Sequence, residues 1–233
     1  MKNDFKKAIT STQKLKRRDS ILASAKQLME EEKYNEINMN QIAQKAGVAK
    51  GTVYLYFQTK QELFLSVMLE SFQLWKEKYI LAVRQHGVDG IYESCMNVSD
   101  LFRKTIYIIT TETENFTKNI GTEKRREFRE AIKDIFLEID KVTEEQIDDF
   151  HKGDFLQIMM QITALDIGLY YTKNLNLIIF EMITDGDKLK QEELSEQMYH
   201  NFVLDLIEKI KLKNNTSKKG GLRESKGIHA KRK

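Results

Sequence analysis

Not one proline interrupts this chain of 233 residues, although proline is the residue that most strongly ends helices. The eleven glycines are scattered along the chain. A sequence with so few breakers favours long helices joined by short loops, whereas an all-β fold would need many tight turns. We therefore predict an all-α protein.

Cysteine content and hydropathy indicate where such a protein resides. Cys95 is the only cysteine, which excludes an internal disulfide and fits a reducing compartment. The N-terminus is basic, but no apolar signal-peptide core follows it, and no segment approaches the roughly 18 apolar residues of a membrane span. These features predict a cytoplasmic protein.

The net charge of +3 hides an uneven distribution. Residues 1–75 hold 12 Lys and Arg against 8 Asp and Glu, residues 76–212 hold 18 against 26, and residues 213–233 hold 8 against 1. Basic ends on an acidic body predict that one face meets a polyanion, although charge alone does not separate DNA from RNA or membrane.

The N-terminal segment has the pattern of a helix-turn-helix. After a basic arm at 1–16, apolar spacing predicts a helix over 17–33. Asn38 then serves as the N-cap of a short helix over 39–46, Gly47 supplies a left-handed turn, and a second short helix runs from about 49 to 57. Thr59 can cap a long helix over 60–81.

The second short helix commits few side chains to the core. On a helical wheel Val53 and Phe57 share the inner face, Lys50 and Tyr54 lie near the boundary, and the outer face carries Gly51, Thr52, Leu55 and Tyr56. That outer face fits a B-DNA major groove, with Thr52 as a hydrogen-bonding group and Leu55 as a partner for a thymine methyl. Tyr54 could instead be a packing residue, and Leu55 an ordinary exposed leucine.

The stretch "IAQKAGVAKGTVYLYFQTKQEL", residues 42–63, resembles the DNA-binding signature of the TetR family of bacterial transcriptional regulators. One departure is Ala49, where the family usually has a hydroxyl residue that caps the helix. The resemblance implies that Tyr54, Tyr56 and Lys60 contact DNA. The candidate DNA-binding residues are Asn38, Asn40, Gln41, Lys50, Gly51, Thr52, Tyr54, Leu55, Tyr56 and Lys60, although Asn38 is also a cap and Gln41 could be merely solvated.

The body, residues 76–212, keeps a helical period without a recognisable signature. Two β-rich runs, "TIYIITTE" and "NLIIFEMI", could be strands by periodicity alone, but their surroundings favour helix. The resemblance implies a small-molecule pocket in this body and a homodimer through the apolar segments near 155–173 and 192–212, although these segments could instead form an ordinary intramolecular core. The candidate pocket residues are large side chains that could equally be core: Phe102, Tyr107, Phe116, Phe136, Met159, Met160 and Tyr170.

These observations lead to one function and its alternatives. We expect a dimeric regulator, which the resemblance implies to be a repressor, with a helix-turn-helix domain at 17–75, a ligand-binding and dimerisation domain at 76–212 and a disordered basic tail at 213–233. Its partners would be a palindromic double-stranded operator and a small hydrophobic or amphipathic ligand. Alternatively, the body binds a protein. An enzyme is not expected, because no catalytic set, cofactor loop or metal-ligand spacing occurs.

Overall fold

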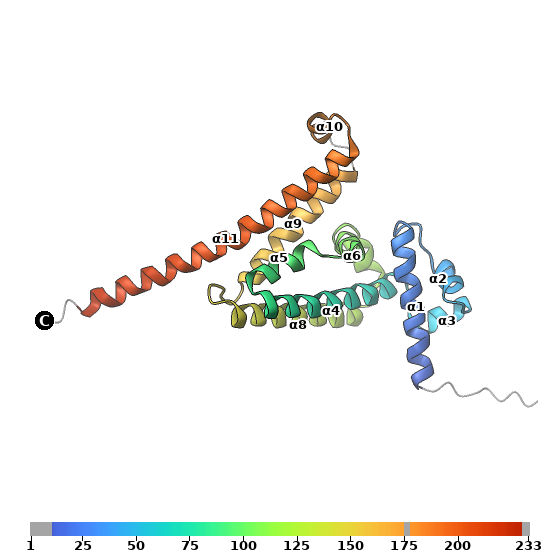
Figure 1. Ribbon diagram of the computed structural model, residues 1–233. Helices are drawn as coiled ribbons and strands as arrows, with labels where there is room; N and C mark the ends of the chain where they lie inside the picture. Colours follow the sequence, from blue (N-terminus) through green and yellow to red (C-terminus); the bar gives the residue numbers. More distant parts are fainter. Residues whose placement is uncertain (1–10, 175–177, 230–233) are drawn as a thin grey trace, which may run out of the picture. The chain divides into compact units, whose positions relative to one another are not determined.

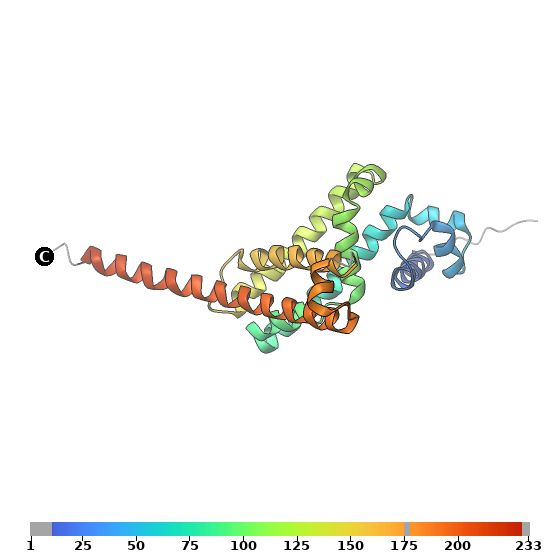
Figure 2. The ribbon, with the colours of Figure 1, turned by 90° about the horizontal axis from the view of Figure 1, so that it is seen from above.

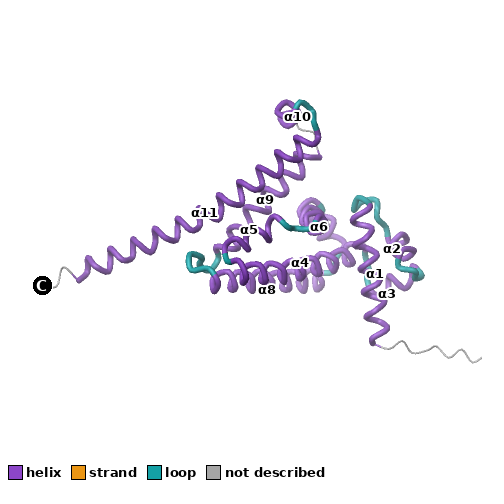
Figure 3. Tube along the Cα trace, in the orientation of Figure 1, coloured by secondary structure: helices purple, strands orange, loops and turns teal. Residues whose placement is uncertain are grey.

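A computed structural model describes the backbone of residues 11–174 and 178–229, and it describes all side chains there except those of residues 100, 117, 170–174, 178–180 and 215–229. Every regular element in these ranges is an α helix, as the absence of proline predicts (Figure 3). In chain order they are α1 (Ser11–Glu31), α2 (Met39–Lys45), α3 (Lys50–Tyr56), α4 (Lys60–His86), α5 (Val88–Met96), α6 (Asp100–Thr111), α7 (Thr113–Asn119), α8 (Thr122–Gln146), α9 (Asp154–Asn174), α10 (Ile178–Thr184) and α11 (Lys188–His229) (Figure 1).

Three helix boundaries differ from the sequence expectation. α1 already begins at Ser11, inside the segment expected to be an arm, of which residues 1–10 lie outside the described range. α4 continues to His86, and α11 continues to His229 through most of the segment expected to be a disordered tail. The added segments contain Gln, Lys, Leu and Arg, which are good helix formers, and no proline stops the preceding helix.

Most residues of both β-rich runs lie in helices. The first run, residues 105–112, lies in α6 except for Glu112, which follows that helix, so it is helical as predicted. The second run, residues 176–183, overlaps α10, while its residues 176–177 lie outside the described part of the chain. Tertiary context therefore overrides the strand preference of the isoleucines and threonines in α6.

The chain divides into two compact units, and the first contains residues 1–71 and 100–130. Its core draws buried apolar side chains from α1, α2, α3, the first part of α4, α6 and α7. Ile21, Ile42, Val53 and Phe64 are fully or almost fully buried in this core. The contact between α1 and α6 thus places helices from the middle of the chain in the same unit as the predicted helix-turn-helix.

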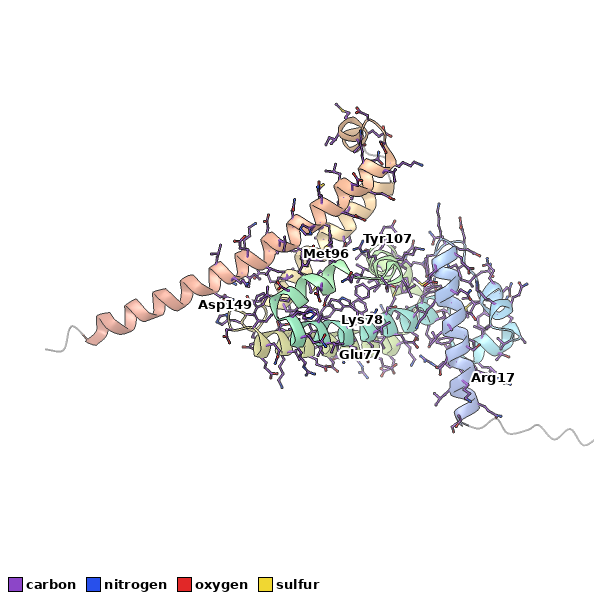
Figure 4. The ribbon with its side chains drawn as sticks, in the orientation of Figure 1. Arg17, Glu77, Lys78, Met96, Tyr107 and Asp149 are labelled. Carbon is purple, nitrogen blue, oxygen red and sulfur yellow. The ribbon has the colours of Figure 1, made fainter. Side chains whose placement is uncertain are left out.

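The second unit contains residues 72–99 and 131–233. Here the later part of α4 packs against α8, and Lys76 forms an ion pair with Glu138 at 2.7 Å across this contact. Aromatic rings fill the interior. The ring centres of Trp75 and Tyr79 are 5.5 Å apart, and those of Tyr79 and Phe155 are 5.1 Å apart. Figure 4 shows the side chains that fill the space between these helices.

Hydrogen bonds fix α9 and α11 within the second unit. The two helices lie side by side in both views (Figures 1 and 2). The buried side-chain amide of Asn214 on α11 donates to the carboxylate of Asp154 at the start of α9, at 2.6 Å. Tyr199 donates from its hydroxyl to the carbonyl oxygen of Cys95. Among the described helices, none combines the length and apolar character that crossing a bilayer requires.

Candidate DNA-binding site

Asn38 caps α2 as the sequence predicts. Its side-chain oxygen accepts hydrogen bonds from the backbone N–H groups of Asn40 and Gln41, at 3.0 and 3.2 Å. Gln41 reciprocates, because its side-chain oxygen accepts from the N–H of Asn38 at 2.8 Å. This reciprocal pair is a capping box, which satisfies N–H groups that the first turn of a helix otherwise leaves without partners.

Gly47 makes the turn between α2 and α3. Its φ of 65° lies in the left-handed region, which glycine adopts without steric cost. The N–H of Val48 donates to the carbonyl of Ala43, and the N–H of Gly47 donates to that of Gln44. These two bonds form a Schellman motif, which satisfies carbonyl groups at the end of α2. The chain then turns and enters α3.

α3 presents two very different faces. Val53 is fully buried and Phe57, at the C-cap, is 2% exposed, whereas Leu55 is 83% exposed. A Cβ added at Gly51 would meet nothing within 4 Å, so this residue faces open space. Thr52 is half-buried, and Tyr56 is half-buried against the core of the first unit, which corrects its assignment to the fully outward face. Ala49 provides no side-chain cap, as expected.

Several predicted residues come together around one open concavity of about 470 Å³. Its lining combines the start of α2, one side of α3 and the start of α4. Lys50 is exposed, with its ammonium 5.9 Å from the centre of the Tyr54 ring, and Tyr54 is 44% exposed. The lining residues are Ile37, Asn38, Met39, Asn40, Lys50, Tyr54, Gln58, Thr59 and Lys60.

Two predicted contact residues are half-buried and bonded to other groups of the protein. Both ends of the Gln41 amide are engaged, because its nitrogen donates to the Glu32 carboxylate at 3.0 Å in addition to the capping box. The Lys60 ammonium donates to the carbonyl oxygens of Tyr34 and Ile37, at 2.7 and 2.8 Å. Burial lowers the pKa of Lys60, and the negative charge of Glu112 opposes that shift. The Lys60 ammonium is therefore already bonded to two carbonyl groups of the protein, and its contact with DNA stays a prediction.

Sequence reasoning missed Gln58 and Thr59 as members of the concavity, and it missed Tyr34 as the partner of Lys60. Thr59 does cap α4, because its hydroxyl oxygen accepts from the N–H of Glu62 at 3.1 Å. The adjacency of Gln58 and Thr59 to Lys60 could have suggested their place. Nothing in the local sequence links Tyr34 to a residue 26 positions later.

The candidate pocket residues do not form one group. Phe102, Tyr107 and Phe116 belong to the first unit, and Phe116 stacks on Tyr34 with ring centres 5.9 Å apart. Tyr107 lies on α6 (Figure 4). In the second unit Phe136 joins the aromatic core, 6.1 Å from Phe155. Met159 is half-buried, Met160 is 76% exposed, and the side chain of Tyr170 lies outside the described residues.

Comparisons with known proteins agree on this segment. The sequence model of a family described as "Bacterial regulatory proteins, tetR family" matches residues 21–67. The "Fatty acid metabolism regulator protein" of Bacillus subtilis is 38% identical over 50 residues, and "HTH-type transcriptional regulator EthR" of Mycolicibacterium smegmatis is 38% identical over 52 residues. These stretches are 22% of this chain, and they span 26% and 24% of the two relatives, so about a quarter of each relative is matched.

Two further similarities extend over most of the chain. "Uncharacterized HTH-type transcriptional regulator YfiR" of Bacillus subtilis is 23% identical over 212 residues, which are 86% of this chain and 98% of that one. A crystal structure of a TetR-family regulator from Mesorhizobium loti has the same fold, with a TM-score of 0.50, 16% identity and coverage of 84% and 98% of the two chains. Residues 21–67 therefore match the DNA-binding segment of the TetR family of bacterial regulatory proteins, and the all-helical fold is that of a solved TetR-family regulator.

Proposed function

We propose that this regulator binds a palindromic DNA operator as a homodimer and that a small molecule bound in the body releases it. The observation that carries the DNA part is the outward face of α3, where Leu55 is 83% exposed next to the fully buried Val53. An exposed aliphatic side chain on the outer face of a short recognition helix suits contact with a thymine methyl group in the major groove. The concavity beside it carries Lys50 and the Tyr54 hydroxyl, which suit phosphate groups.

DNA geometry supports a dimer. One short recognition helix reads only a few base pairs, whereas two such helices about one turn of DNA apart read a palindrome. α9 packs against α11 on one side and exposes Met160, Ala164 and Gly168, four residues apart, on another. α11 also exposes Leu204 and Leu212, at 43% and 60%. We propose that these apolar surfaces pack against their copies in a second subunit.

Ligand release requires a difference in affinity between two states of the protein. A ligand shifts DNA binding only if it prefers the spacing of recognition helices that does not fit successive major grooves. The side chains that a ligand would meet in the interior of the second unit include the aromatic rings of Trp75, Tyr79 and Phe136, so we propose a hydrophobic or amphipathic ligand.

Footprinting and gel-shift assays on the DNA that flanks the gene test the proposal. We expect protection of a palindrome at moderate salt, with two protected half-sites separated by about one helical turn. Addition of a ligand identified by thermal-shift screening should weaken that protection. Absence of any protected palindrome, while the protein remains folded and soluble, would contradict the DNA part of the proposal.

A second candidate places a protein partner on the body. Met182 and Ile183 on α10 are 74% and 63% exposed, and Leu189 at the start of α11 is 72% exposed. Neighbouring exposed apolar side chains of this size suit a protein surface. Replacing Met182 and Leu189 by serine should then change regulation in cells without changing operator affinity of the purified protein. A small-molecule effector alone predicts no such effect.

A further inference from the structure

Lys60, the first residue of α4, contacts the loop that joins α1 to α2. Two of its three ammonium protons donate to the carbonyl oxygens of Tyr34 and Ile37, at 2.7 and 2.8 Å. The ammonium also lies 4.0 Å from the centre of the Tyr34 ring, within the range of a cation–π contact. Lys60 is thus bonded to a loop that precedes it by more than twenty residues.

The far side of this contact is anchored in the core. The Tyr34 ring meets that of Phe64 edge-on at 5.0 Å and stacks on that of Phe116 at 5.9 Å. Tyr34 is 7% exposed and Ile37 is 1% exposed. The carbonyl groups that Lys60 binds therefore belong to residues with fixed side chains, so the bonds hold the loop in one place.

The loop ends at the DNA-binding face. Ile37 directly precedes Asn38, the N-cap whose side chain accepts from the N–H groups of Asn40 and Gln41. Asn38, Asn40 and Lys60 all line the concavity beside α3. Charge-assisted hydrogen bonds are stronger than neutral ones, so the Lys60 ammonium is well suited to fix where α2 begins.

Lys50 provides the contrast on the same concavity. Its side chain is exposed, and its described contact is with the Tyr54 ring at 5.9 Å. An exposed lysine beside a tyrosine hydroxyl can reach a phosphate without breaking bonds in the protein. Lys60, by contrast, already uses two of its three N–H groups on the carbonyl groups of Tyr34 and Ile37, and Ile37 is the residue before the cap.

We propose that Lys60 is a positioning residue of the DNA-binding face, which holds the α1–α2 loop through the carbonyl groups of Tyr34 and Ile37, and that Lys50 is the lysine of this concavity that binds phosphate. This inference rests on the proposed DNA-binding function. It assigns the two lysines different roles, although both are candidate DNA-binding residues by sequence.

Hydrogen exchange in the protein without added DNA is the first test. Lys60→Met keeps the aliphatic stem and removes the ammonium, so both charge-assisted hydrogen bonds to the loop are lost. We expect the N–H groups of Asn40 and Gln41 to exchange at least about tenfold faster, since tenfold corresponds to the loss of about one such bond. Lys50→Met should leave both rates unchanged. Tyr34→Phe is a second control, because it keeps the ring and the carbonyl group. Unchanged rates in a folded Lys60→Met protein would overturn the proposal.

The salt dependence of DNA binding is the second test. Lys50→Met should reduce the slope of log K against log salt by about 0.9 for each phosphate that the variant no longer neutralises. Lys60→Met should weaken binding about tenfold at every salt concentration and leave the slope as in the wild type. If Lys60→Met lowers the slope as much as Lys50→Met, then Lys60 binds phosphate and the proposal is wrong.

A milder variant covers the case in which Lys60→Met does not fold. Lys60→Gln keeps an N–H donor for a carbonyl group and removes the charge, so we expect partial protection of the Asn40 amide and an unchanged salt slope. A slope reduced by about 0.9 would overturn the proposal. If the wild-type protein itself binds no specific DNA, the proposed function fails, but the exchange experiment still decides the role of Lys60 in the loop.

Discussion

At the scale of single residues, two side chains of α3 that are close in sequence differ in burial, and we expect them to serve stability and DNA binding respectively. Val53 is fully buried and Leu55 is 83% exposed. We expect Val53→Ala to lower the free energy of unfolding by about 2 kcal/mol, because it removes buried methyl groups. Leu55→Ala should leave stability within about 0.5 kcal/mol and reduce discrimination at one base pair by about 1 kcal/mol.

Urea denaturation and competition binding with operators mutated at each position separate these two effects. An equal loss of affinity for all DNA sequences in Leu55→Ala would contradict a base contact. Stability losses of the same size in both variants would contradict the difference in burial.

Cys95 illustrates a residue with a purely structural setting. It is 1% exposed, and burial raises the pKa of its thiol to about 12, with a further contribution from the negative charge of Asp166. Because the thiolate is the reactive form, the folded protein should react with iodoacetamide far more slowly than a free cysteine at about pH 8. Mass spectrometry should show labelling that rises as urea unfolds the chain. Rapid labelling of the native protein would contradict this burial.

At the scale of elements, α2 depends on its cap. Asn38→Ala removes the acceptor for two N–H groups and should cost about 1 kcal/mol of stability. Asn38→Asp keeps a good cap, so stability should be retained, but it adds a negative charge to the concavity and should weaken DNA binding. Thermal denaturation and gel shifts on both variants check this. Wild-type DNA affinity in a stable Asn38→Asp protein would place the concavity away from DNA.

At the scale of the whole molecule, the proposed dimer rests on the exposed face of α9. Met160→Glu replaces a 76% exposed apolar side chain by a charge that would lie in the interface. We expect this variant to be a folded monomer in sedimentation experiments and to bind the palindrome much more weakly. Leu137→Glu, an equivalent change at a 43% exposed leucine of α8, is the control and should remain dimeric. If the Met160→Glu protein were still a dimer, the exposed face of α9 could not be the dimer interface.

Several local features of this chain could be predicted because they depend on residues close in sequence. Asn38 caps α2 by accepting from an N–H group only three residues further on, and Gly47 adopts a left-handed turn that glycine takes without steric cost. Val53 and Phe57 share a face because they are four residues apart. Proline-free stretches set the helical class, and even the isoleucine-rich run of α6 follows it.

Contacts between distant residues were decided by the tertiary structure alone. Lys60 reads as an exposed lysine at a helix start, but its ammonium reaches the carbonyl groups of Tyr34 and Ile37. Phe102 and Phe116 read as pocket residues of the body, but they lie in the unit that contains the helix-turn-helix. Backbone periodicity fixes which side of a helix a residue occupies, whereas its partner depends on how helices far apart in the sequence pack around a shared core.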